Sequence, residues 1–443
     1  MSKPLVAVVG RPNVGKSTFF NKIVGRRVSI VEDTPGVTRD RIIAEAEWAS
    51  KHFMLIDTGG IEPSSAEVIP MQMRAQAEIA MEMADVIIFM VDAKDGLTTA
   101  DREVADILRR KNKDVILVAN KVDGRKLPDD FYDLYELGLG EPFAVSSANQ
   151  TGLGDVLDEV LAKIPWADYD KEDDEDNVKI AIIGRPNVGK SSIVNALVGE
   201  ERVIVSDIAG TTRDSIDTPF EKDGTKYTLI DTAGIRRRSK IYDDIEKFSV
   251  VRAVAAIERC DVALLVIDAT RGVADQDKRI AGLAHEAGKG IIIVVNKWDL
   301  VSKETNTMRD MTNKIKGELV FMDYAPVIFT SAVKGTRLPQ LIDMAKGVSE
   351  SRAMRVSTGQ LNALIQDAMM MQNPPTDKGK RLKIYYVSQI GVKPPLFSFQ
   401  VNDRLLMHFS YSRYLENKIR AAYGFEGTSI KFVFREKGDS DGQ

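Results

Sequence analysis

Residues 10–17 read GRPNVGKS, and residues 184–191 repeat the same eight letters. Gly-x-x-x-x-Gly-Lys-Ser between a strand and a helix is the pattern of a phosphate-binding loop, in which backbone N–H groups close around phosphate at a helix N-terminus. Apolar, strand-like segments precede both copies. We therefore expect two phosphate sites, with Lys16 and Lys190 reaching the β and γ phosphates of a nucleotide.

The duplication extends beyond these loops. Three further segments recur in the same order, two at the offset of 174 residues that separates the loops and one at 176. Two copies of one domain are therefore fused in tandem. The matched pairs are Thr38-Arg-Asp40 with Thr212-Arg-Asp214, Asp57-Thr-Gly-Gly60 with Asp231-Thr-Ala-Gly234, and Asn120-Lys-Val-Asp123 with Asn296-Lys-Trp-Asp299.

An acidic segment separates the copies. Residues 168–177 carry seven carboxylates and one lysine, and like charges at this density repel one another and cannot form a core. At roughly 150 residues per domain, 443 residues also leave room for a third domain. The expected organisation is a first domain at 1–166, a flexible linker at 167–177, a second domain at 178–350, a third at 351–436 and a disordered tail at 437–443.

Short apolar runs alternate with amphipathic helical stretches in each copy. This alternation predicts an α/β fold with two doubly wound, mainly parallel sheets. Ligands of such sheets bind at the carboxyl ends of the strands, so the motifs of a copy should meet at one edge. The strands expected in the first copy are Leu5–Val9, Phe53–Ile56, Val86–Val91, Val115–Ala119 and Pro142–Val145.

Oxygen-bearing side chains around each loop suit Mg²⁺, which prefers oxygen ligands. The candidate ligands are Ser17, Thr38 and Asp57 in the first copy and Ser191, Thr212 and Asp231 in the second. Thr38 and Thr212 follow the loop lysines at one shared spacing, in polar segments where a hydroxyl could join the metal only while a γ phosphate is present. They are switch candidates, and Gly60 and Gly234 can each offer a backbone N–H to that phosphate.

Asn-Lys-x-Asp after an apolar strand is the pattern expected for reading guanine. Asp123 or Asp299 can accept hydrogen bonds from the ring N–H and the exocyclic amine of guanine, whereas adenine presents a mismatched edge. The expected ligands are therefore GTP and GDP. Lys121 and Lys297 would lie along the base, Asn120 and Asn296 would tie the loop together, and Ser147-Ala148 and Ser331-Ala332 could each present a backbone N–H to the guanine carbonyl.

The candidate site residues fall into a small catalytic group and a larger binding group. The catalytic group is Lys16, Thr38, Gly60, Lys190, Thr212 and Gly234. The nucleotide-binding group in the first copy is Gly10, Arg11, Pro12, Asn13, Val14, Gly15, Lys16, Ser17, Thr18, Asp57, Thr58, Gly59, Gly60, Asn120, Lys121, Asp123, Ser147 and Ala148. In the second copy it is Gly184, Arg185, Pro186, Asn187, Val188, Gly189, Lys190, Ser191, Ser192, Asp231, Thr232, Ala233, Gly234, Asn296, Lys297, Asp299, Ser331 and Ala332.

Composition sets the class of protein. The net charge of −4 conceals a split, because residues 352–443 hold 14 Lys and Arg against 8 Asp and Glu, a balance of +6, and the rest of the chain balances at −10. A polyanionic partner is first sought at the basic end. The single cysteine, Cys260, excludes an intramolecular disulfide. No apolar run approaches the roughly 20 residues that cross a bilayer, and no signal-peptide pattern opens the sequence, so we expect a cytoplasmic protein.

The last domain follows a different pattern from the two repeats. Its expected order is αββαβ: a helix at Gln360–Met371, strands at Leu382–Gln389 and Phe397–Val401, a helix at Ser412–Tyr423 and a strand at Ile430–Phe434. Gly424-Phe-Glu-Gly427 has the letters of the loop with which KH domains clamp RNA backbone. It joins a helix to a strand rather than two helices, however, and Glu426 would repel phosphate, so we expect no clamp there. RNA binding through Lys378, Lys380, Arg381 and Lys383, and a merely solvated basic loop, stay open as equal alternatives.

Taken together, these features resemble the tandem GTPases of the EngA, or Der, family of bacterial ribosome-assembly factors, over essentially the whole chain. The doubled motifs, the acidic linker and the KH-like αββαβ domain carry the resemblance. It implies GTP hydrolysis as part of a molecular switch, with the large ribosomal subunit and its ribosomal RNA as partners. We expect a monomer that uses neither DNA nor a membrane.

Hydrolysis needs a group that organises the reaction. Many GTPases position water with a Gln after Asp-x-x-Gly, but Ile61 and Ile235 stand there. Asn13 and Asn187 could instead help hold K⁺ against the phosphates, and the family's resemblance to potassium-activated GTPases favours this over a purely loop-stabilising role. Arginines stay open as an alternative: Arg39, Arg213 and Arg236–Arg238.

Two other functions stay open from the residues alone. One is a binding module in which one of the two sites holds GTP only as a structural or regulatory ligand. The other is a GTPase of tRNA modification or of membranes, for which the sequence offers no modification domain and no amphipathic anchor.

Overall fold

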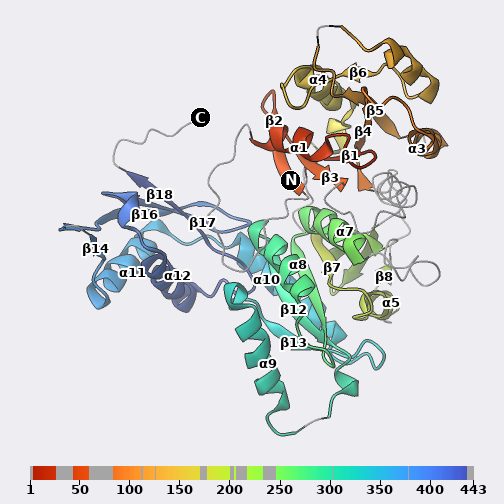
Figure 1. Cartoon of the computed structure of the whole chain (residues 1–443). Coiled ribbons are helices and arrows are strands. Elements are labelled where there is room, and N and C mark those ends of the chain that lie inside the picture. The colour runs from red at the N-terminus through yellow and green to blue at the C-terminus, as the bar shows by residue number, and fades with distance from the viewer. Residues whose placement is uncertain are drawn as a thin grey trace. The chain divides into compact units, whose positions relative to one another are not determined.

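The protein is described from a computed structural model of the whole chain (Figure 1). It describes residues 3–25, 43–58, 83–110, 113–124, 126–169, 177–199, 204–205, 217–232, 246–302, 304–377 and 379–436. Several residues singled out above lie outside this set: Thr38, Arg39, Gly59, Gly60, Ile61, Thr212, Arg213, Ala233, Gly234, Ile235, Arg236–Arg238 and Lys378. Residues 170–176 of the expected linker and the expected tail, 437–443, lie outside it as well.

The first repeat folds around one six-stranded sheet of order β2-β3-β1-β4-β5-β6. All neighbours are parallel except β2, which runs antiparallel to β3. The strands are β1 (Leu5–Val9), β2 (Ile43–Trp48), β3 (Lys51–Asp57), β4 (Val86–Asp92), β5 (Asp114–Asn120) and β6 (Phe143–Ala144). The helices are α1 (Lys16–Val24), α3 (Thr99–Arg110), η4 (Asp129–Leu137), α4 (Leu153–Lys163) and η5 (Trp166–Asp168).

Helices cover both faces of this sheet. Leu5, Ala7 and Val9 of β1 pack with α3 and η4, whereas Val6 and Val8 pack with α1 and α4. Every residue of β1 is buried, which explains why the strand reads as a continuous apolar run. Each fully buried aliphatic side chain contributes about 1.5–3 kcal/mol. The expected doubly wound, mainly parallel sheet is confirmed.

The second repeat has a seven-stranded sheet of order β13-β12-β11-β7-β10-β9-β8, in which β8, β9 and β10 pair antiparallel and the others parallel. Its strands are β7 (Asn177–Ile183), β8 (Ile204–Val205), β9 (Thr218–Lys222), β10 (Thr225–Ile230), β11 (Val262–Asp268), β12 (Gly290–Asn296) and β13 (Val327–Phe329). The helices in this part of the sequence are α5 (Lys190–Val198), α7 (Glu246–Arg259), α8 (Asp275–Glu286), η7 (Trp298–Leu300), α9 (Thr307–Glu318), η8 (Val320–Met322) and α10 (Leu338–Ala353).

The C-terminal domain, drawn in blue in Figure 1, has the expected αββαβ order, with an additional antiparallel pair of two-residue strands, β14 and β15, after the first helix. β16 pairs antiparallel with β17, and β17 pairs parallel with β18. The second of the expected segments begins as a strand only at residue 384, because the backbone N–H of Leu382 bonds to the carbonyl of Pro375 instead. The elements are α11 (Thr358–Met371), β14 (Thr376–Asp377), β15 (Lys380–Arg381), β16 (Ile384–Gly391), β17 (Leu396–Val401), η9 (Arg404–Leu406), α12 (Phe409–Tyr423) and β18 (Lys431–Glu436).

Gly427 is the last residue of the segment Gly424-Phe-Glu-Gly427. Its backbone hydrogen bonds connect the C-terminal domain to the second repeat. Its N–H donates to the carbonyl of Tyr324 at 3.0 Å, and its own carbonyl accepts from Ile291, the second residue of β12, at 2.7 Å. Its φ of 72° lies in the left-handed region, and a Cβ there would collide with Val348 of α10. The glycine therefore serves a close backbone joint.

Candidate nucleotide site

The phosphate-binding loops follow β1 and β7 and lead into α1 and α5. Gly15 and Gly189 are the residues before these helices, both with φ of 97°. The loop lysines close each loop on itself. Lys16 Nζ donates to the carbonyls of Gly10 at 2.8 Å and Arg11 at 2.7 Å, and Lys190 repeats both bonds with Gly184 and Arg185.

Two of the candidate Mg²⁺ ligands of the first copy, Ser17 and Asp57, lie together. Ser17 Oγ donates to Asp57 Oδ2 at 2.5 Å, although the two residues come from α1 and from the end of β3. A hydroxyl and a carboxylate at this distance present the hard oxygen ligands that Mg²⁺ prefers. In the second copy, the backbone N–H of Asp231 bonds to Asp217 Oδ1 at 2.9 Å, with Asp231 in the left-handed region at φ 57°.

The threonines that follow these aspartates point elsewhere. Thr58 is buried, and its hydroxyl donates to the carbonyl of Val8 at 2.5 Å. Thr232 is buried as well, and its hydroxyl lies 2.7 Å from that of Thr218. Both hydroxyls therefore hold the strand ends together, and contact with a nucleotide would have to come from their backbone.

The arginines of the loops also turn away from the helix N-terminus that they precede. Arg11 contacts Asp95 and Asp101 with nitrogen-to-oxygen distances of 3.4 and 3.7 Å. In the second copy, Arg185 Nε lies 2.8 Å from Asp277 Oδ2. Asp101 and Asp277 are both fully buried. The two guanidinium groups thus fasten the loops to α3 and α8. The loop lysines contact the backbone carbonyls of Arg11 and Arg185, not the arginine side chains.

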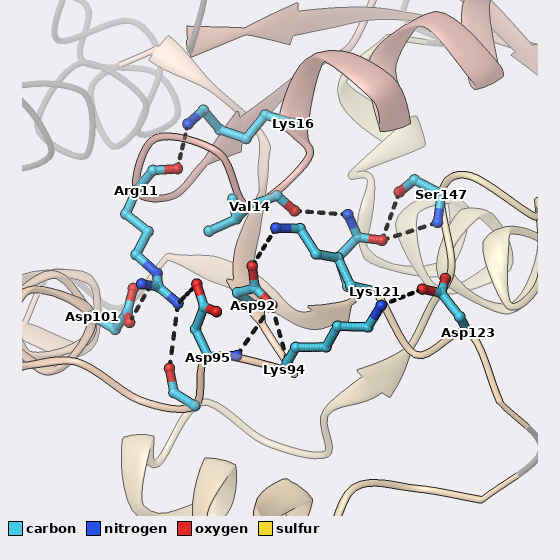
Figure 2. A network of polar contacts seen from close by, with 12 residues as sticks. Arg11, Val14, Lys16, Asp92, Lys94, Asp95, Asp101, Lys121, Asp123 and Ser147 are labelled. Atoms are coloured by element: carbon cyan, nitrogen blue, oxygen red, sulfur yellow. Dashed lines mark hydrogen bonds and ion pairs between the residues drawn. The ribbon is translucent and has the colours of Figure 1, made fainter.

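Asparagine side chains connect three loops of each site, and Figure 2 shows the polar contacts around Val14 and Ser147 in the first site. Asn120, at the end of β5, donates from Nδ2 to the carbonyl of Val14 at 2.7 Å, while its Oδ1 accepts from the N–H and the hydroxyl of Ser147, both at 2.9 Å. Asn296 donates to Val188 at 2.9 Å and accepts from the N–H of Ala332 at 3.2 Å. The phosphate loop and the two base loops therefore form one hydrogen-bonded unit.

Sequence reasoning did not single out the aspartates that end β4 and β11. Lys121 Nζ lies 2.5 Å from Asp92 Oδ2, and Lys297 Nζ lies 2.7 Å from Asp268 Oδ2. Burial is the largest single cause and raises the pKa of Asp92 and Asp268. The hydrogen bonds from these lysines, the lysine charges and the hydrogen bonds from Lys94 and Thr270 together outweigh burial, so both pKa values are lowered. The offset of 176 residues that relates Asn120 to Asn296 also relates Asp92 to Asp268. This repetition in the sequence could have identified the two aspartates as site residues.

The carboxylate expected to read guanine in the first copy accepts a hydrogen bond from within the protein at each of its oxygens. Asp123 Oδ1 accepts from Ser146 Oγ and Oδ2 accepts from Lys94 Nζ, each at 2.6 Å. The bond from Lys94 is the main cause that lowers the pKa of Asp123, and it raises the pKa of Lys94 in turn. Neither Lys94 nor Ser146 was anticipated as a partner of this carboxylate.

The two asparagines expected to hold K⁺ have a left-handed backbone conformation. Asn13 and Asn187 have φ of 65° and 62°, and both side chains are exposed. Asparagine tolerates the left-handed region better than most residues, so the conformation by itself favours asparagine here. The exposed amides leave a cation role open.

The basic loop of the C-terminal domain is partly paired. Lys380 Nζ donates to Asp403 Oδ2 at 2.9 Å, which raises the pKa of the lysine. Arg381 donates to Asn373 Oδ1 at 2.5 Å. Lys383 is exposed. Among the described residues, no helix has the length and apolar character needed to cross a membrane.

Family models match most of the chain. A model described as a 50S ribosome-binding GTPase matches residues 5–121 and again 179–297. A model described as the C-terminal KH-domain-like region of EngA bacterial GTPase enzymes matches residues 355–435.

Full-length relatives extend this likeness. Proteins called GTPase Der are 58% identical over 441 residues in Alkaliphilus oremlandii, 59% over 443 in Lachnospira eligens and 57% over 437 in Geobacillus thermodenitrificans. These alignments cover 99–100% of this chain and 100% of each relative.

Proposed function

Because the chain belongs to the Der (EngA) family of GTPases, we propose that it hydrolyses GTP to GDP and phosphate at both sites and acts as a switch in the biogenesis of the large ribosomal subunit. The carrying observation is the duplicated loop unit. Asn120 and Asn296 fix the distance between a phosphate loop and a base-reading loop in each copy, as binding of one nucleotide across both requires.

The assignment of roles follows from this unit. Lys16 and Lys190 would contact the β and γ phosphates, and Asp123 and Asp299 would read guanine. Ser17 with Asp57 and Ser191 with Asp231 would hold Mg²⁺, which when bound supplies charge compensation to the phosphates. Thr38, Thr212, Gly60 and Gly234 keep their proposed roles at the γ phosphate.

The partner would be ribosomal RNA of the large subunit, in the cytoplasm, bound by a monomer. The +6 balance of residues 352–443 and the 50S ribosome-binding description of the matched family model support the RNA and the large subunit as partners. We infer the domain boundaries given above, since the matched segments, 5–121, 179–297 and 355–435, fall within them.

Binding to the large subunit should strengthen with a GTP analogue and weaken steeply with salt, because contacts with phosphates release counterions. Co-sedimentation over a KCl series with analogue, with GDP and without nucleotide measures both effects. Equal pelleting in all three states would contradict the switch.

If the exposed Lys383 contacts a phosphate, Lys383→Gln should reduce by about one the slope of the logarithm of binding affinity against the logarithm of salt concentration. Lys314→Gln, on α9, is the matched control and should leave the slope unchanged.

Potassium should activate hydrolysis. Replacing K⁺ by Na⁺ should slow turnover about tenfold or more, equivalent to roughly 1.4 kcal/mol of barrier, because Asn13 or Asn187 would help hold the cation that offsets charge on the β–γ bridge. Steady-state rates in matched KCl and NaCl, with saturating GTP and Mg²⁺, measure this.

Substitution of the asparagines separates a cation role from a backbone role. Because both sites hydrolyse GTP, the double variant with Asn13→Ala and Asn187→Ala should remove the difference between the salts. The double variant with Asn13→Gly and Asn187→Gly should do the same while tolerating φ of 65° and 62°, so an effect confined to the alanine variant would indicate loop strain. Equal rates of the wild type in both salts would eliminate the cation and direct attention to Arg39, Arg213 and Arg236–Arg238.

A further inference from the structure

Lys94 reaches the base-reading loop of the first copy from a neighbouring strand end. It lies two residues after Asp92, the last residue of β4, and its Nζ donates to Asp123 Oδ2 at 2.6 Å. Its backbone N–H donates to Asp92 Oδ1 at 3.0 Å, and this bond fixes the turn from which the side chain extends. Figure 2 shows Lys94 beside the loop that carries Lys121 and Asp123.

Both carboxylate oxygens of Asp123 already accept a hydrogen bond. Oδ1 accepts from Ser146 at 2.6 Å and Oδ2 accepts from Lys94. A guanine held by this carboxylate would bring a ring N–H and an exocyclic amine to the same two oxygens. With guanine bound, four donors would share these two oxygens: the Ser146 hydroxyl, the two guanine groups and the ammonium of Lys94.

The second copy lacks this ammonium. The residue at the position of Lys94 is Thr270, as the shared offset of 176 shows. Thr270 donates from Oγ1 at 2.6 Å and from its backbone N–H at 2.9 Å to Asp268 Oδ1. The backbone turn is therefore repeated, but the side chain bonds to the strand-end aspartate and brings no charge to the base-reading loop.

We propose that Lys94 competes with guanine for Asp123 and sets a lower guanine nucleotide affinity at the first site than this loop would otherwise have. The inference deepens the proposed function and rests on the assignment of Asp123 as the guanine reader. Lys94 is then an affinity-determining residue of the first site, and Thr270 stands at its position in the second copy.

The size of the effect follows from exposure. Lys94 and Asp123 are 58% and 40% exposed, so water and salt screen the pair, and an exposed ion pair of this kind changes an equilibrium by about two- to fivefold. Removing the ammonium should therefore tighten binding by a factor in that range. The gain should shrink as added salt weakens the pair.

The test measures GDP affinity at the first site of the full-length chain. Every protein carries Lys190→Ala, so that fluorescent GDP reports the first site. Lys94→Thr, which installs the residue of the second copy, should bind GDP about two- to fivefold more tightly in 50 mM KCl and nearly like the parent in 500 mM KCl. Lys94→Arg, which keeps the charge, should stay close to the parent.

The outcomes separate this inference from the proposed function. Unchanged or weaker GDP binding by Lys94→Thr would overturn the competition while leaving guanine reading intact. Asp123→Asn in the same background tests the reading itself, since it should shift affinity from GDP to xanthosine diphosphate. No shift in that variant would remove the assignment on which both ideas rest.

Discussion

Asp299→Asn should change the second site from guanine to xanthine specificity. Guanine offers two donors to the carboxylate, and an asparagine would set its NH₂ group against one of them. Xanthine replaces the exocyclic amine by a carbonyl that this NH₂ group can meet. Sites that read a ligand through buried hydrogen bonds reject mismatched analogues strongly, so we expect GDP affinity to fall on the order of 100-fold or more and xanthosine diphosphate affinity to rise.

Competition between GDP and xanthosine diphosphate at the second site measures the exchange. Asp310→Asn is a suitable control, because that carboxylate is 66% exposed on α9 and should leave both affinities unchanged. ATP bound as tightly as GTP by the wild type would refute the guanine assignment before any variant is made.

The central strands were predictable because a strand that is buried on both faces of a sheet has apolar residues at nearly every position. β1 and β4 are apolar at nearly every position and entirely buried, and their expected bounds differ from the observed ones by at most one residue. β2 is different: only Ala46 among its six residues is buried. Its pairing with β3 comes from tertiary context, which a search for apolar runs does not detect.

The spacing of motifs predicted which loops meet but not where each side chain points. Asn120 was expected to tie the base-reading loop together, and in the structure it bonds to the phosphate loop and to Ser147. Arg11 belongs to the same eight-letter loop, yet its side chain extends to Asp95 and Asp101. Periodicity and motif letters carry no information on rotamers, so this pairing and the contact of Lys94 with Asp123 become visible only in the fold.

The KH-like letters illustrate the same limit in a different way. The order of elements indicated that Gly424-Phe-Glu-Gly427 was misplaced for an RNA clamp, but not what it does. In the structure Gly427 bonds to Tyr324 and Ile291, and the buried Phe425 belongs to the core of the C-terminal domain. The close approach of two backbones explains the second glycine.

Gly15→Ala should abolish tight nucleotide binding at the first site. Gly15 has φ of 97°, a conformation that costs an L-residue roughly 1–2 kcal/mol. A Cβ at this position would also collide with Nδ2 of Asn120, which must then release the carbonyl of Val14 or the N–H of Ser147. Each buried polar group left unsatisfied costs about 1–3 kcal/mol.

The loop can escape this cost only by moving the amides that would hold the phosphates, so we expect GDP affinity at the first site to fall about 100-fold or more, equivalent to roughly 2.8 kcal/mol. Gly25→Ala is the matched control, since Gly25 ends the same helix at φ of −69° and a Cβ there meets nothing within 4 Å among the described residues. Gly189→Ala should repeat the loss at the second site, where the collision is with Asn296.

Calorimetric titration with Mg²⁺ and GDP measures the affinity of each variant, and thermal melting measures its stability, so the two experiments separate lost binding from lost stability. Wild-type affinity in Gly15→Ala would show that the asparagine linkage does not shape the phosphate loop.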